Sequence, residues 1–261
     1  MSEPGNEGNT AGQYSRRGLL HTGLAASGGL LVAACGGTGA AVRAGQSMAA
    51  TPTAQATPAQ LTAAQAWARL VEGNRRWVSG DLQHPDQSIV RRRELAFAQY
   101  PFAVVVSCID SRVPPETVFD QGIGDLFVIR TGAQTIDRLI TASIEYGPVE
   151  NGTPLVVVLG HQRCGAVQAT VDSIEKNEHL PGNLGAIVDA IRPAYEEAHS
   201  TGGDIVDQTV RSQIVRTAAA LEGDTVLAGH VRDNSLGIAG VYYNLDTGQV
   251  SILKTAGFIL S

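Results

Sequence analysis

Short apolar runs alternate with longer segments of helical periodicity over most of the chain. Three runs have the length of a β-strand and are rich in β-branched residues, at 102–107, 126–130 and 155–159. Runs that are apolar on both faces are typical of parallel strands covered by helices on both sides. The pattern predicts an α/β domain with a mostly parallel central sheet flanked by helices.

The segments around these runs carry apolar residues at helical spacing. Thr62 is a residue type that caps helices, and the apolar positions Ala66 and Leu70 follow it. Between the second and third runs, residues 136–146 repeat the helical spacing. Further helices are predicted at 88–98, 165–177, 184–198 and 206–221.

The last part of the chain predicts the edge of the sheet. Residues 225–229 have the composition of a fourth strand. The apolar segments 238–245 and 250–253 flank a turn sequence, which predicts a C-terminal antiparallel hairpin or edge strand. We expect the folded domain to span residues 61–261.

Composition narrows the class of protein. Of the 261 residues 43% are hydrophobic and 17% charged, and the formal net charge is -6. These values are typical of a globular domain. The short basic run at 91–93 stands alone, and a nucleic-acid-binding surface needs a broader positive area, so we expect no nucleic-acid partner.

The first sixty residues differ from the rest. An Arg16-Arg17 pair precedes a weakly apolar stretch that ends in small residues and Cys35. This order is similar to a twin-arginine export signal with the lipobox of bacterial lipoproteins, whose cysteine is acylated. We therefore expect a signal peptide at 1–35, a flexible linker at 36–60, and an exported protein anchored through a lipid on Cys35 at the extracytoplasmic face of the membrane. A disordered tail without a signal is the alternative.

Two of the predicted strands run into residue types that bind metals. The first is followed by Cys108, and the third by His161 and Cys164. The carboxyl ends of parallel strands meet at one edge of a sheet, so these residues converge if the two strands are neighbours. Cys, His and Cys form a known catalytic zinc set that leaves the fourth position open, and thiolates favour zinc over magnesium or calcium. A closed structural zinc site with Asp110 as fourth ligand stays possible.

Residues 107–113 and 160–166 resemble the two signature segments of β-class carbonic anhydrases, and the resemblance extends from about residue 73 to residue 248. It implies that Cys108, His161 and Cys164 bind Zn²⁺. It also implies the reversible hydration of carbon dioxide to bicarbonate and a proton by zinc-bound hydroxide.

The resemblance assigns further roles. Asp110 pairs with Arg112, which keeps the carboxylate off the metal. When released, Asp110 fills the fourth position and closes the site, as in some members. Gln99 matches a glutamine that hydrogen-bonds bicarbonate. Members build their active sites at a dimer interface, which implies a homodimer or homotetramer.

Two other functions fit the same residues. A carbon disulfide or carbonyl sulfide hydrolase shares the fold and the zinc set, and differs in how substrate reaches the metal. A non-catalytic zinc-binding lipoprotein would keep Asp110 on the metal. The presence of Arg112 and Gln99 beside Asp110 favours an enzyme, since metal storage needs neither.

Overall fold

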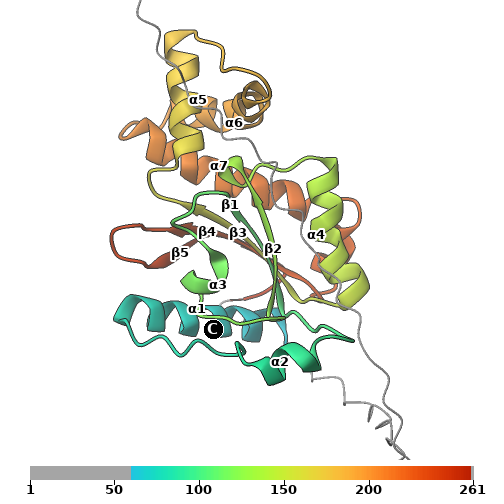
Figure 1. Ribbon diagram of the computed structural model, residues 1–261. Coiled ribbons are helices and arrows are strands. Elements are labelled where there is room, and N and C mark those ends of the chain that lie inside the picture. The colour runs from blue at the N-terminus through green and yellow to red at the C-terminus, as the bar shows by residue number, and fades with distance from the viewer. Residues whose placement is uncertain (1–59, 260–261) are drawn as a thin grey trace, which may run out of the picture. The chain divides into compact units, whose positions relative to one another are not determined.

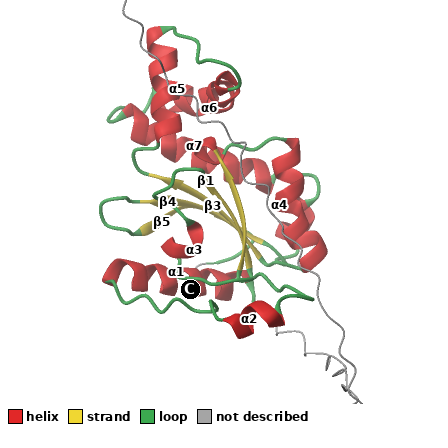
Figure 2. Ribbon diagram, in the orientation of Figure 1, coloured by secondary structure: helices red, strands yellow, loops and turns green. Residues whose placement is uncertain are grey.

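The computed structural model describes residues 60–259, which form one five-stranded sheet with helices on both faces (Figure 1, Figure 2). The strands are β1 (Ala103–Cys108), β2 (Leu126–Thr131), β3 (Leu155–His161), β4 (Gly237–Tyr243) and β5 (Val250–Ala256). They lie in the order β2-β1-β3-β4-β5. The pairs from β2 to β4 are parallel, and β5 is antiparallel to β4. The predicted fold class and C-terminal hairpin are confirmed.

The helices occupy most of the segments between the strands. They are α1 (Ala63–Ser79), α2 (Ile89–Glu94), α3 (Pro115–Val118), α4 (Arg138–Asn151), α5 (Gly165–Lys176), α6 (Leu184–Ala198), α7 (Ile205–Glu222) and α8 (Leu227–Arg232), with a 3-10 turn at Gly132–Gln134. The sheet separates α1 and α3 from α4 and α7, and α5 and α6 pack against α7 (Figure 1).

The predicted start of α1 is confirmed in detail. Thr62 accepts a hydrogen bond from the backbone N–H of Gln65, and the Gln65 side chain accepts one from the Thr62 N–H. This reciprocal capping satisfies two backbone donors that a helix start leaves free. The apolar side of α1 then buries Ala66 and Leu70 completely against the sheet.

The alternation of side chains along β1 divides the core into two clusters. Ala103 and Val105 pack on the side of α1, whereas Val104, Val106 and Cys108 pack on the side of α4 and α7. Successive side chains of a strand point to opposite faces, so this register directs Cys108 to the helix-rich side. The start of α5 lies on that same side.

Two predicted elements differ in the structure. The strand expected at 225–229 is wrong: this segment turns and enters α8 at Leu227, and the Asp224 side chain accepts hydrogen bonds from the N–H groups of Val226 and Leu227 in that turn. Such a bond satisfies free donors at a helix start, and Leu227 is buried. The helix expected at 88–98 is shorter, covering only α2.

Residues 1–59 lie outside the described part of the chain. The predicted signal peptide, Cys35 and nearly all of the linker fall there and stay predictions. Among the helices of residues 60–259, none combines the length and the apolar character needed to cross a membrane.

Candidate metal centre

The topology brings the two ligand-bearing strand ends together. β1 pairs directly with β3, although β2 and α4 separate them in the sequence. In the sheet order, the connection after β1 leads to β2 on one side and the connection after β3 leads to β4 on the other, which opens a crevice between the carboxyl ends of β1 and β3. Cys108 is the last residue of β1, and His161 is the last residue of β3.

A glycine allows β3 to lie close to α7 just before the histidine. A Cβ built on Gly160 would lie 2.4 Å from Cγ1 of Ile214, a contact that real side chains do not make. Gly160 therefore permits the helix to pack against the end of the strand. Any larger residue here would force either the Ile214 side chain or the end of β3 to shift.

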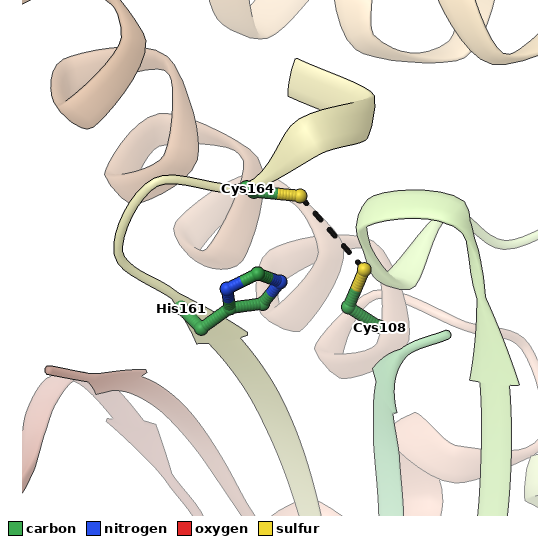
Figure 3. A group of neighbouring side chains, drawn as sticks. All are labelled: Cys108, His161 and Cys164. Carbon is green, nitrogen blue, oxygen red and sulfur yellow. Dashed lines mark hydrogen bonds between the residues drawn. The ribbon is translucent and has the colours of Figure 1, made fainter. Parts of the chain in front are cut away.

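The side chains of Cys108, His161 and Cys164 point toward one common space (Figure 3). All three are buried, and their ligand atoms lie within 4.8 Å of one another. The two sulfur atoms are 3.8 Å apart. Two thiolates that bind one tetrahedral zinc at about 2.3 Å lie about 3.8 Å apart, so the sulfur pair fits that ion.

The hydrogen bonding of His161 selects the nitrogen that faces the metal. Nδ1 lies 3.0 Å from the carbonyl oxygen of Gln162, which only accepts, so Nδ1 carries the proton. Nε2 is buried and has no hydrogen-bond partner. Its free lone pair is the third ligand of the cluster, and the carbonyl contact is typical of metal-binding histidines.

Backbone N–H groups surround the two sulfur atoms. Cys164 is the N-cap residue of α5, where the positive end of the helix favours a thiolate. The N–H of Ala133 lies 3.4 Å from Sγ of Cys108, and Ala133 has a φ of 52°, a strained conformation for alanine. The contact between the two Sγ atoms lowers the pKa of Cys108 and raises the pKa of Cys164. The pair thus shares a proton that a bound cation would replace.

Asp110 is held beside the cluster by Arg112. Nε of Arg112 donates to Oδ1 at 2.9 Å, Nη2 donates to Oδ2 at 2.7 Å, and the Arg112 backbone N–H also donates to Oδ1. This bidentate contact lowers the pKa of Asp110 to about 2. Oδ2 lies 3.9 Å from Nε2 of His161, so the carboxylate stands at the edge of the metal position and is engaged by Arg112.

Gln99 occupies a different part of the chain's fold. It is exposed, in the segment that leads into β1, whereas Cys108 ends that strand. Five residue steps at roughly 3.3 Å each separate the two ends of β1. The structure therefore groups Asp110 and Arg112 with the three ligands and places Gln99 toward the opposite end of the strand.

Two residues at this site had no predicted role. Arg130, at the end of β2, donates to the carbonyl oxygens of Cys108 at 2.8 Å and Asp110 at 2.5 Å. Asp246, in the β4–β5 hairpin, accepts from the side chains of Gln162 and Arg163. Sequence spacing could not have identified either residue, because each contacts the ligand loops from a segment that is distant in the chain.

Comparison with known proteins agrees with the geometry. The fold and the Cys–His–Cys cluster define an α/β metalloprotein with three protein ligands, and the pattern of the carbonic anhydrase family matches residues 103–250. Carbonic anhydrase 2 of Mycobacterium tuberculosis is 39% identical over 195 residues, which cover 74% of this chain and 94% of that protein. The carbonic anhydrase of Mycolicibacterium smegmatis is 40% identical over 195 residues, with 74% and 95% covered.

Solved structures show the same architecture. The β-carbonic anhydrase CafA of Aspergillus fumigatus superposes with a TM-score of 0.55 at 25% identity, over 72% of this chain and 90% of that one. Tetrameric β-carbonic anhydrases of Sordaria macrospora share the fold, with a TM-score of 0.58 at 20% identity, over 74% of this chain and 98% of that one. The chain belongs to the β-class carbonic anhydrase family.

Proposed function

We propose that this protein catalyses the reversible hydration of carbon dioxide to bicarbonate and a proton, with zinc held by Cys108, His161 and Cys164. The observation that carries the proposal is the buried three-ligand cluster with its 3.8 Å sulfur separation. Asp110 is engaged by Arg112, so the protein supplies three ligands and leaves one tetrahedral position for water or substrate.

Zinc, when bound, lowers the pKa of a coordinated water so that a nucleophile is available near neutral pH. The chain's own residues orient this chemistry. His161 is fixed by the Gln162 carbonyl, and Arg112 holds the Asp110 carboxylate in its ionised, accepting form. Oδ2 of Asp110 then accepts a hydrogen bond from the attacking water and orients it toward carbon dioxide.

Asp110 also lies on the way to solvent. Its side chain is 15% exposed and that of Arg112 is 50% exposed, in contrast to the three fully enclosed ligands. A proton released during hydration therefore has a short route from the cluster past the Asp110–Arg112 pair to bulk water.

Stopped-flow hydration of carbon dioxide by the purified protein, measured with zinc content across pH, tests the proposal. We expect stoichiometric zinc and a rate that rises toward alkaline pH, because two thiolates offset the charge of the metal. Stoichiometric zinc without activity at any pH would contradict the reaction, and absence of zinc would contradict the metal centre.

We also propose that Gln99 serves the site of a second copy of the chain. Gln99 lies toward the opposite end of β1 from its own Cys108, so a contact with bicarbonate requires another subunit. Apolar side chains are exposed beside both places: Phe97 is 93% exposed and Tyr100 41%, and Ile109 next to Cys108 is 63% exposed. Exposed apolar side chains at both places support cover by a partner.

Mixed oligomers test this arrangement. Gln99→Ala and Cys108→Ala chains are each expected to have little activity alone. If they are co-expressed, a site with the metal ligands of one chain and Gln99 of the other is complete, so activity should return. Failure to regain activity, or a monomer by light scattering, would contradict the shared site.

The N-terminal segment supports a further proposal on location. The Arg16-Arg17 pair, the apolar stretch and Cys35 suit export followed by lipid attachment at Cys35. Mass spectrometry of the membrane fraction should find a mature chain that begins at a lipid-modified Cys35. A mature chain that begins elsewhere would contradict the proposal. So would a chain with unmodified Cys35 that is found in the soluble fraction, as expected for Cys35→Ala.

A further inference from the structure

The two residues between His161 and Cys164 are tied to the β4–β5 hairpin. Arg163 donates to both carboxylate oxygens of Asp246, at 2.9 and 2.6 Å, and Gln162 Nε2 donates to the same carboxylate at 3.1 Å. Oε1 of Gln162 in turn accepts a hydrogen bond from the backbone N–H of Leu245 at 3.1 Å. One carboxylate of the hairpin thus holds both residues of the ligand loop.

The backbone of this loop supports the metal site at two points. The carbonyl of Gln162 accepts from Nδ1 of His161, which orients the imidazole. The carbonyl of Arg163 accepts from Nη2 of Arg112 at 3.2 Å, the same nitrogen that donates to Asp110. A shift of the loop would therefore disturb both a metal ligand and the pair that holds Asp110.

The loop also has a conformation that needs outside support. Arg163 has a φ of 50°, in the left-handed region that is unfavourable for a residue with a Cβ. Such conformations persist where surrounding contacts hold them. The Asp246 carboxylate supplies such contacts to the Arg163 side chain.

We propose that Asp246 is a positioning residue of the metal centre: it holds the Gln162–Arg163 turn so that His161 and Arg112 keep their orientations. The inference rests on the proposed zinc site and adds a residue remote from the metal. The Asp246 side chain is 58% exposed, so its contribution to folding stability is expected to be small. Its effect should therefore appear at the metal rather than in the melting temperature.

The test measures how fast zinc passes from the intact protein to a chelator. Asp246→Asn keeps the shape of the side chain and removes its charge. We expect zinc release to accelerate by about three- to tenfold, below the roughly 10- to 100-fold effect of groups that bond a ligand directly. The visible spectrum of the cobalt-substituted protein should shift as well, because it reports ligand geometry.

Glu197→Gln provides the matched control. Glu197 on α6 also pairs with an arginine, Arg216 on α7, and accepts a second bond from Ser212, with exposure similar to that of Asp246. We expect this variant to leave zinc release and the cobalt spectrum unchanged, with a melting temperature close to that of Asp246→Asn.

A double-mutant cycle isolates the contact. Arg163→Met should accelerate zinc release no more than Asp246→Asn, because it leaves the bond from Gln162 to Asp246 in place. The Asp246→Asn/Arg163→Met pair should accelerate release about as much as Asp246→Asn alone, because Asp246→Asn already weakens the contact that Arg163→Met removes. Additive effects, or equal release from Asp246→Asn and Glu197→Gln, would overturn the positioning role alone. Absence of zinc from the unaltered protein would overturn the metal centre and this role together.

Discussion

The two ligand-bearing loops of the centre are stabilised in different ways. The loop after β1 carries its main polar contact within itself, because Asp110 and Arg112 are two positions apart. The loop after β3 depends on a hairpin 83 positions away, through Asp246 and Arg163. The first loop is thus largely encoded by neighbouring residues, whereas the second takes its shape only once β4 and β5 are in place.

This difference predicts how each loop responds to substitutions in other parts of the fold. Substitutions in the hairpin should reach His161 through the Gln162 carbonyl, and should reach the Asp110–Arg112 pair only through the bond that Arg112 donates to the Arg163 carbonyl. The first loop has remote supports as well, and Arg130 on β2 is the one that contacts both Cys108 and Asp110. The comparison can therefore be tested one support at a time.

The largest expected effect comes from the ligands, where the two loops should be equivalent. Cys108→Ser and Cys164→Ser each remove one thiolate from a three-ligand set. We expect each to lose zinc and to slow carbon dioxide hydration by on the order of a thousandfold or more, because the metal supplies the nucleophile. Metal analysis and stopped-flow assays check this, with circular dichroism to verify folding. If either variant kept zinc and full activity, the two cysteines would not be equivalent as ligands.

Asp110→Asn should have the next largest effect. It should slow catalysis without reducing zinc content, and so distinguish the catalytic role of the first loop from metal binding. The amide keeps the size of the side chain but loses the charge that accepts from Arg112 and from water. We expect hydration to slow by about a hundredfold, within the range for an acid–base group, with zinc content unchanged. Loss of zinc in proportion to activity would mean that Asp110 supports the metal instead.

Arg130→Met removes the remote support of the first loop. The carbonyl oxygens of Cys108 and Asp110 lose charged donors at 2.8 and 2.5 Å, so the loop gains freedom. We expect kcat/KM to fall about tenfold, the lower end of what supporting groups contribute at metal sites. Arg75→Met, at an exposed arginine of α1, is the control and should be neutral. An unchanged kcat/KM would mean that the first loop is held by its local contacts alone.

The smallest expected effect on activity belongs to Asp120→Asn, which changes a carboxylate–arginine pair that serves only the fold. Burial raises the pKa of Asp120, but bonds from Arg76 and from the N–H groups of Gln83 and His84 outweigh it, and the pKa is lowered. We expect unfolding to become easier by about 2–4 kcal/mol near neutral pH, with kcat/KM unchanged.

The pH dependence of this effect has a definite sign. A carboxyl whose pKa is lower in the folded state stabilises the protein above its unfolded pKa, about 3.9, and this stabilisation is lost as pH falls through the folded value. Denaturant unfolding should therefore show the wild-type advantage over Asp120→Asn shrinking below about pH 4. An advantage that grows toward acid would contradict the assignment.

The sequence predicted the features that depend on neighbouring residues. β-branched runs marked β1, β2 and β3, and Thr62 marked the start of α1, because burial and helix capping act over a few positions. Cys108, His161 and Cys164 could be grouped because strand ends in a parallel sheet converge.

The remaining features depend on contacts between distant segments. Asp246 lies in a turn sequence that predicts only a hairpin, and its partner Arg163 is brought there by the pairing of β3 with β4. The apolar, strand-like segment 225–229 enters α8 instead, after a turn in which Asp224 accepts two backbone N–H groups. The apolar pattern alone could not separate these two structures.

The adjacency of β1 and β3 also makes the metal a cross-link. Cys108 and Cys164 are 56 positions apart, and an ion bound to both closes a loop of that length. Closing such a loop covalently restricts the unfolded chain by about 4 kcal/mol in the chain-entropy description. Metal occupancy should therefore govern how long the protein survives against unfolding and proteolysis, as well as how fast it turns over carbon dioxide.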